Sequence, residues 1–240
     1  MSRTRLAGLL ALALCAFAVS AASASAAAPE FKPFTICNET AGTGNYGTKA
    51  ICESPTGVEK AGGKFHRHNI FFTSTSGVST LKTAKNTYTC ESETDIGDII
   101  SATSVKMTMH YFRCGTILGE TTIRCKSKSP ASEGQEDIKT EELTGTLGGT
   151  EAEPTEKLEP SAGSTAPFTE LKCGTLEGVV KGAVTGKVSP VKTRSKTGKV
   201  TFLNATGLTF RSEALELTSQ DDETFFRNVG HTESEEVEVT

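Results

Sequence analysis

The sequence predicts an all-β protein: an antiparallel β-sandwich, or a partly open barrel, preceded by a small disulfide-stapled β-hairpin unit. Short segments of alternating apolar and polar residues recur along the chain, separated by turn-forming residues. Gly is frequent, at 23 residues, and no helical periodicity persists for long. Cysteines recur among the strand-like segments, which is typical of small exported β-domains.

Length and charge limit the class of protein. A chain of 240 residues holds one or two domains. Its formal net charge is −4, so it offers no basic field for nucleic acid. We therefore expect no nucleic-acid partner.

The first 28 residues predict a secretory signal peptide. Arg3 and Arg5 precede an apolar run over 6–19, which is too short for a comfortable membrane span. Overlapping A-x-A sites place cleavage after Ala26 or Ala28. Removal of this segment leaves no predicted membrane span, and we expect a secreted, extracellular protein.

Six cysteines remain after the signal peptide: Cys37, Cys52, Cys90, Cys114, Cys125 and Cys173. An even number in an exported chain predicts disulfides, and six cysteines allow 15 pairings. Spacing across two glycine-containing turns favours Cys37 with Cys52 and Cys114 with Cys125, which leaves Cys90 for Cys173. No C-x-x-C pair occurs, so a zinc-thiolate site is not favoured.

Residues 29–65 are expected to form the small hairpin unit. Its strand-like runs, FTIC (34–37) and TKAIC (48–52), flank a glycine-rich turn. A unit of this size depends on its disulfide or on a neighbour for stability.

Residues 66–240 are expected to form the sandwich domain. The clearest strand is 103–113, where Val105, Met107, Met109 and Tyr111 share one face. Other predicted strands are 68–74, 79–83, 87–92, 121–126, 138–147, 168–173, 176–191, 214–219 and 235–240.

Several segments predict turns or loops. Residues 127–137 are polar, and prolines interrupt 151–167, so both are expected to be loops. Residues 199–210 predict a hairpin that turns at 204–207. The acidic segment SQDDET (219–224) is interpreted as a solvated turn.

The pattern of cysteines, glycines and aromatic residues resembles an uncharacterised family of secreted, cysteine-containing, β-rich proteins from high-GC Gram-positive soil bacteria. The resemblance covers nearly the whole mature chain and implies a shared exported β-scaffold, without a catalytic residue. Its motifs are PEF (29–31), Phe34, Cys37, Gly44, Tyr46, Cys52, Gly62, Gly63, Phe65, TYTCESETDIGDI (87–99), FRCG (112–115), Cys125, FTELKCGTLEGVVKGAVTGKVSPV (168–191) and the EEVEV ending.

His66 and His68 are candidate metal ligands in KFHRHNIFF (64–72). Residues two apart on a strand point to one face, so both imidazoles could bind one cation, with His110, His231 or a carboxylate as third ligand. The competing interpretation is a solvated strand face.

A second candidate metal site is ESETDIGD (91–98). Glu91, Glu93, Asp95 and Asp98 loosely match the alternating oxygen ligands of a calcium loop. The glycine falls one place late and the closing Glu is replaced by Ala102, so an acidic strand end and turn is the competing interpretation.

No catalytic constellation is apparent, so the sequence predicts no catalytic residue and no cofactor. We expect a secreted, non-enzymatic binding, adhesion or structural module with an extracellular or cell-wall partner. Self-association is a further option. The alternative is a secreted hydrolase or metal-dependent enzyme that uses His66, His68 and carboxylates.

Overall fold

The structure, a computed structural model, describes residues 27–54, 56–130, 136–227 and 233–240. Residues 1–26 of the predicted signal peptide, and His231, lie outside these ranges. Within them, no helix is long and apolar enough to cross a membrane.

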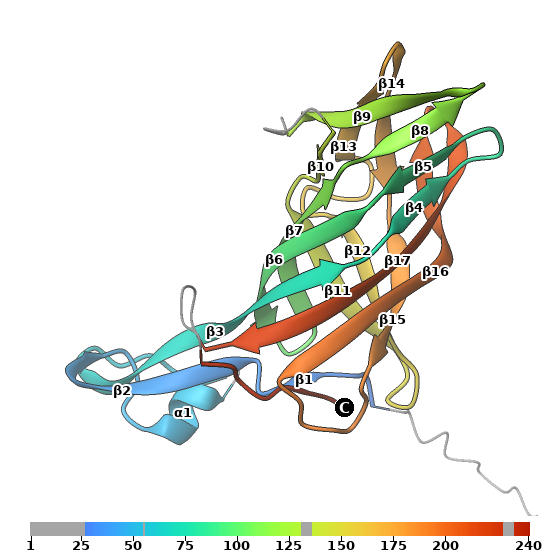
Figure 1. The fold of residues 1–240 in the computed structure, drawn as a ribbon. Coiled ribbons are helices and arrows are strands. Elements are labelled where there is room, and N and C mark those ends of the chain that lie inside the picture. The colour runs from blue at the N-terminus through green and yellow to red at the C-terminus, as the bar shows by residue number, and fades with distance from the viewer. Residues whose placement is uncertain (1–26, 55, 131–135, 228–232) are drawn as a thin grey trace, which may run out of the picture.

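The all-β prediction is confirmed, and every strand pairing in the described chain is antiparallel (Figure 1). The strands are β1 Phe31–Lys32, β2 Thr35–Gly44, β3 Gly63–Ser76, β4 Ser79–Lys82, β5 Thr87–Cys90, β6 Ser92–Ser101, β7 Ser104–Phe112, β8 Gly115–Leu118, β9 Thr121–Ser129, β10 Ile138–Lys139, β11 Leu143–Gly149, β12 Pro154–Pro160, β13 Pro167–Cys173, β14 Leu176–Gly182, β15 Val184–Ser189, β16 Thr197–Phe210, β17 Glu213–Phe226 and β18 Glu238–Val239.

The large sheet closes on itself. We call the first ring the closed series β3, β6, β7, β11, β12, β15, β16 and β17, in which each strand pairs with the next and β17 pairs back to β3. Alternate side chains of these strands therefore point into a shared interior. On β7, Val105, Met107, Met109 and Tyr111 are buried as the period-two pattern predicts.

A second ring shares β16 and β17 with the first. It consists of β4, β5, β8, β9, β13, β14, β16 and β17. The two rings are possible because β16 and β17 are long. The 199–201 part of β16 pairs with β15 and its 208–210 part pairs with β14.

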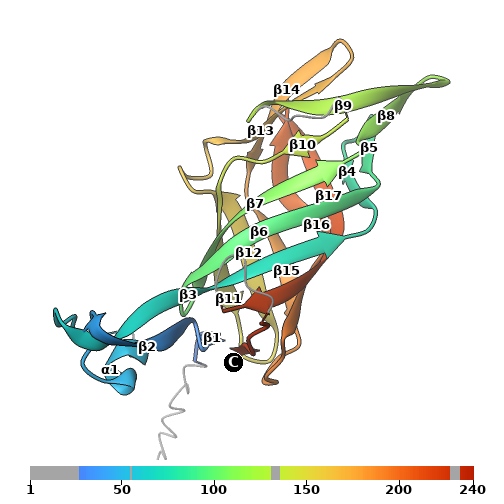
Figure 2. The same ribbon diagram turned by 60° about the vertical axis from the view of Figure 1, so that its left-hand side comes forward.

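The N-terminal unit lies at one end of the molecule, and β8, β9 and β14 lie at the other (Figure 2). β2 pairs with the first half of β3, whereas the second half of β3 belongs to the first ring. β3 thus runs continuously across the predicted 65/66 boundary. At the termini, β1 pairs with β18.

The prediction of a strand at 48–52 is wrong, because Lys49–Glu53 form the short helix α1. Thr48 caps it by accepting a hydrogen bond from the Ile51 amide. Arg67 of β3 holds the helix end by donating to the Cys52 and Ser54 carbonyls at 2.7 and 2.6 Å. These tertiary contacts outweigh the strand-like local pattern.

Two predicted turn regions are strands. Pro154 and Pro160 are the first and last residues of β12, which pairs with β11 along its whole length. The predicted 151–167 loop therefore contains a strand that begins and ends at a proline. Residues 199–210 do not form a hairpin but one continuous strand, β16. Asn204 and Gly207 have φ values of 49° and 113°, and they produce bulges in its pairing with β17.

The disulfide prediction is correct for Cys37–Cys52 and wrong for the other two pairs. Cys90 is bonded to Cys114 and Cys125 to Cys173. Cys114 and Cys125 are indeed neighbours, joined by a 2.8 Å backbone hydrogen bond. They are not bonded to each other, however. Cys125 lies opposite Cys173 in the β9–β13 register, and these two cysteines form the disulfide.

We expect disulfide mapping of the oxidised protein by mass spectrometry to recover Cys90–Cys114 and Cys125–Cys173. Replacing Cys125 and Cys173 by Ala is expected to destabilise the protein by about 4 kcal/mol, because this bond closes the longer loop. The same change at Cys90 and Cys114 is expected to cost about 3 kcal/mol. Urea unfolding measures both losses, and peptides linking Cys114 to Cys125 would contradict the assignment.

Candidate functional site

Two of the four acids in the predicted 91–98 calcium site enter the first ring. Residues 92–101 form β6, not a turn, and the strand period places Glu93 and Asp95 on its inner face. Glu93 is 1% exposed and Asp95 is fully buried. Glu91 is instead exposed and pairs with Arg113 at 3.1 Å, and Asp98 lies on the outer face.

The third acid comes from a segment that the sequence analysis misinterpreted. SQDDET is not a solvated turn, because it lies within β17, where Asp221 and Glu223 alternate inward with Asp222 outward. Asp221 lies opposite Val200 of β16 and is 2% exposed. The sequence signal that could have placed these acids inside is the period of two that begins with Leu215 and Leu217 and continues through Asp221 and Glu223 to Phe225.

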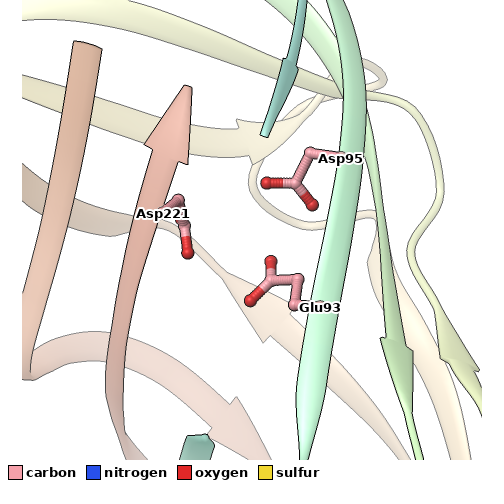
Figure 3. A group of neighbouring side chains, drawn as sticks. All are labelled: Glu93, Asp95 and Asp221. Carbon is pink, nitrogen blue, oxygen red and sulfur yellow. The ribbon is translucent and has the colours of Figure 1, made fainter. Parts of the chain in front are cut away.

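Glu93, Asp95 and Asp221 form what we call the acidic cluster. Their carboxylates face a common space from β6 on one side and β17 on the other (Figure 3). One oxygen from each lies within 4.8 Å of the others. In the described part of the chain, this is the one group of three or more His, Cys, Asp or Glu side chains with such spacing.

Serine hydroxyls fix one oxygen of each carboxylate. Glu93 Oε2 accepts hydrogen bonds from Ser76, Ser79 and Ser219 at 3.0, 3.2 and 3.1 Å. Ser219 is also 2.8 Å from Asp221 Oδ1, and Ser74 donates to Asp95 Oδ2. The other oxygens of two acids, Glu93 Oε1 and Asp95 Oδ1, are buried without a hydrogen-bond partner.

Two further acids, Glu156 of β12 and Glu223 of β17, line the same ring; we call them the acid pair. Glycines make room for them: a Cβ on Gly145 would lie 2.0 Å from Glu156 Oε1, and a Cβ on Gly198 would lie 2.6 Å from Glu223 Oε2. The interior is therefore shaped around carboxylates.

Every buried charged side chain in the described residues is one of these five acids. None of the ion pairs formed by the described residues includes them; those pairs join other side chains, such as Lys106 and Glu142. Buried charges are normally paired or bound to a metal, or they become neutral. The first ring thus concentrates carboxyl groups that no basic side chain of the described residues pairs with.

Burial, followed by the charge of Asp221, raises the pKa of Asp95 to about 8. Burial, followed by the charge of Asp95, raises the pKa of Glu93 well above its ordinary range. The pKa of Asp221 is raised well above its ordinary range by burial and then by the charge of Glu93. In the acid pair, burial raises the pKa of Glu156 to about 7, and burial together with the charge of Glu156 raises that of Glu223.

The histidine candidates lie elsewhere. His66 and His68 are on β3 where it pairs with β2, with ring centroids 6.4 Å apart, and no carboxylate joins them in a three-ligand group within the described ranges. His110 Nε2 lies 3.6 Å from Asp137 Oδ2, away from the other two. The structure therefore does not bring these histidines together as a site.

Two surface grooves adjoin these features. One, of about 580 Å³, lies at the first ring and is lined by Glu223 together with Thr75, Gly198 and Lys199. The other, of about 640 Å³, lies on the second ring and is lined by Lys85, Glu91, Arg113 and four threonines. The first groove reaches Glu223 of the acid pair, and the second lies beside the Cys90–Cys114 disulfide.

Metal-free protein is expected to lose stability as pH rises, opposite to the usual behaviour of carboxylates. The raised pKa values mean that the folded state binds these protons more tightly than the unfolded chain. The stability that these acids contribute is therefore fully present below about pH 4, the ordinary carboxyl pKa. The contribution of Asp95 is lost as pH rises to about 8, its pKa in the fold. Besides the five acids, Tyr111 of β7 faces this interior, and its pKa is raised further by burial.

Thermal unfolding in EDTA should show a midpoint at least ~5 °C lower at pH 8 than at pH 5. Glu156→Gln should reduce this difference, whereas Glu159→Gln, on the outward face of the same strand, should preserve it. A midpoint that rises from pH 5 to pH 8 would contradict the burial of these carboxyls.

Gly145→Ala is expected to destabilise the protein by about 1–3 kcal/mol, because the new methyl group would collide with Glu156 Oε1 and with Val105 Cγ2, 2.5 Å away. Gly148→Ala on the same strand is the control, since its Cβ meets only Thr155 Oγ1 at an ordinary 3.7 Å. Urea unfolding compares the two variants. Equal stabilities would show that the interior does not need the glycine.

Comparison with known proteins found no matching family model, no matching curated protein and no matching solved structure.

Proposed function

We propose that the protein is an exported, non-enzymatic binding module that acts at the cell surface or in the surrounding medium. Three disulfides in the described chain support an oxidising, extracellular setting. The extensive antiparallel pairing supports a rigid scaffold. The observation that carries the binding role is the 640 Å³ groove on the second ring.

The groove is held by the Cys90–Cys114 disulfide. Thr89 and Glu91 flank Cys90, and Arg113 and Gly115 flank Cys114; all four line the groove. Thr89 also pairs with Gly115 in the β5–β8 register. A surface whose backbone is already fixed loses little conformational freedom when it binds a partner.

The lining fits a polar, anionic polymer. Lys85 and Arg113 provide positive charge, and Thr87, Thr89 and Thr122 line the same groove with hydroxyl groups. The two basic side chains are 75% and 68% exposed, and their acidic partners, Glu213 and Glu91, are also at the surface. Arg and Lys bind phosphate and carboxylate groups, which are common in cell-wall polymers.

Purified protein is expected to sediment with isolated Gram-positive cell walls. Lys85→Ala with Arg113→Ala should lower the bound fraction more than tenfold, since it removes both groove cations. The matched control, Lys157→Ala with Lys199→Ala, also removes two cations from exposed ion pairs, but these lie outside the groove. Failure of the wild type to sediment, or equal loss in both double variants, would contradict the proposal.

The hydrolase alternative based on His66 and His68 stays a prediction from the sequence. Turnover of an ester or polymer substrate that is lost in His66→Ala would favour it over the binding module.

A further inference from the structure

We propose that Glu93, Asp95 and Asp221 bind one calcium ion inside the first ring. This site is separate from the groove on the second ring and does not depend on the proposed binding role. It replaces the 91–98 loop predicted from the sequence: two of that loop's acids are retained, two are excluded, and Asp221 is added from a strand more than a hundred residues away in the chain.

Two carboxylate oxygens of the acidic cluster are unsatisfied. Glu93 Oε1 and Asp95 Oδ1 are buried and have no hydrogen-bond partner, although the rest of each carboxylate is bonded to serines. A buried acceptor without a partner is costly. A cation between the carboxylates would satisfy both oxygens and offset the negative charge of the cluster.

Serine hydroxyls hold the carboxylates of the acidic cluster in place. Carboxylates that bind a metal are usually hydrogen-bonded in turn, which fixes their orientation. Here Ser219 contacts Glu93 and Asp221 together, at 3.1 and 2.8 Å, and so links β6 to β17 across β3. Ser74 donates a hydrogen bond to Asp95 Oδ2. The serines thus occupy one oxygen of each acid, and Glu93 Oε1 and Asp95 Oδ1 remain available to a cation.

The donor atoms of the acidic cluster determine which cation fits. All the donor atoms are oxygens, which favour hard cations over zinc or copper. One oxygen from each of the three acids lies within 4.8 Å of the others, which is close enough for all three to bind one ion. Calcium accepts flexible oxygen coordination at about 2.3–2.6 Å, whereas magnesium demands near-ideal octahedral geometry. Magnesium also retains several waters, which a buried cluster accommodates poorly.

The groove at the first ring comes nearest to the acidic cluster at Glu223. Glu223 lines the 580 Å³ groove and lies opposite Ser74 in the β17–β3 register, and Ser74 lies opposite Asp95 in the β3–β6 register. A row of oxygen-bearing side chains therefore leads from the surface groove to the acidic cluster.

The competing state is a proton shared between Glu93 and Asp95. It would also satisfy the two free oxygens, but calcium would then neither bind to the cluster nor raise the midpoint of thermal unfolding. Calcium binding therefore distinguishes the two.

The test uses mature, untagged protein freed of metal with EDTA and then dialysed without chelator. Titration with calcium chloride at neutral pH, followed by calorimetry and elemental analysis, should show one ion per chain and a raised midpoint of thermal unfolding. Asp95→Asn combined with Asp221→Asn should weaken calcium binding more than tenfold. These variants remove buried charge, so folding should persist and can be checked by circular dichroism.

The control is Glu91→Gln with Asp98→Asn, which removes the two acids of the same segment that face away from the cluster. It should bind calcium like the wild type. If the Asp95/Asp221 variant does not fold, Glu93→Gln replaces it. The assignment is overturned if the wild type binds no calcium, if it prefers magnesium, or if binding survives in the cluster variants.

Discussion

The shared hairpin of β16 and β17 is the constraint on which the rest of the structure depends. Both rings close through it, and its register decides which side chains enter the first ring. Because side chains alternate along a strand, a slip of one residue would turn Asp221 and Glu223 outward and bring Asp222 inside. The bulges near Asn204 and Gly207 accommodate the change of partner from β15 to β14 without breaking the strand.

This register has an energetic cost, since five carboxyls lie inside one ring and none forms an ion pair with a basic side chain of the described residues. The fold offsets part of that cost locally: serines from three strands hold Glu93, and glycines clear space for the acid pair. The disulfides reinforce other parts, the N-terminal unit and the second ring. The first ring is stabilised by strand pairing and by the proton or cation that neutralises its acids. If that species is a cation, metal binding is coupled to folding.

The strands and the site were not equally predictable. The alternation over 103–113 is local and uninterrupted, so the buried face of β7 could be inferred from sequence alone. The prolines at the two ends of β12 and the residues of the Asn204–Gly207 bulge are typical turn residues. Only the pairing of these segments with neighbouring strands shows that they are strands themselves. The acids were interpreted as solvated because a single charged residue carries no signal of burial. Asp221 and Glu93 meet only through ring closure, which is a property of long-range pairing.

The most direct test is a high-resolution crystal structure of the protein grown with calcium. A cation within about 2.3–2.6 Å of Glu93 Oε1, Asp95 Oδ1 and an Asp221 oxygen is the predicted result. Anomalous scattering would identify the ion. A short contact between Glu93 and Asp95 oxygens with no ion between them, in crystals grown at saturating calcium, would contradict the account and show that a shared proton balances the interior.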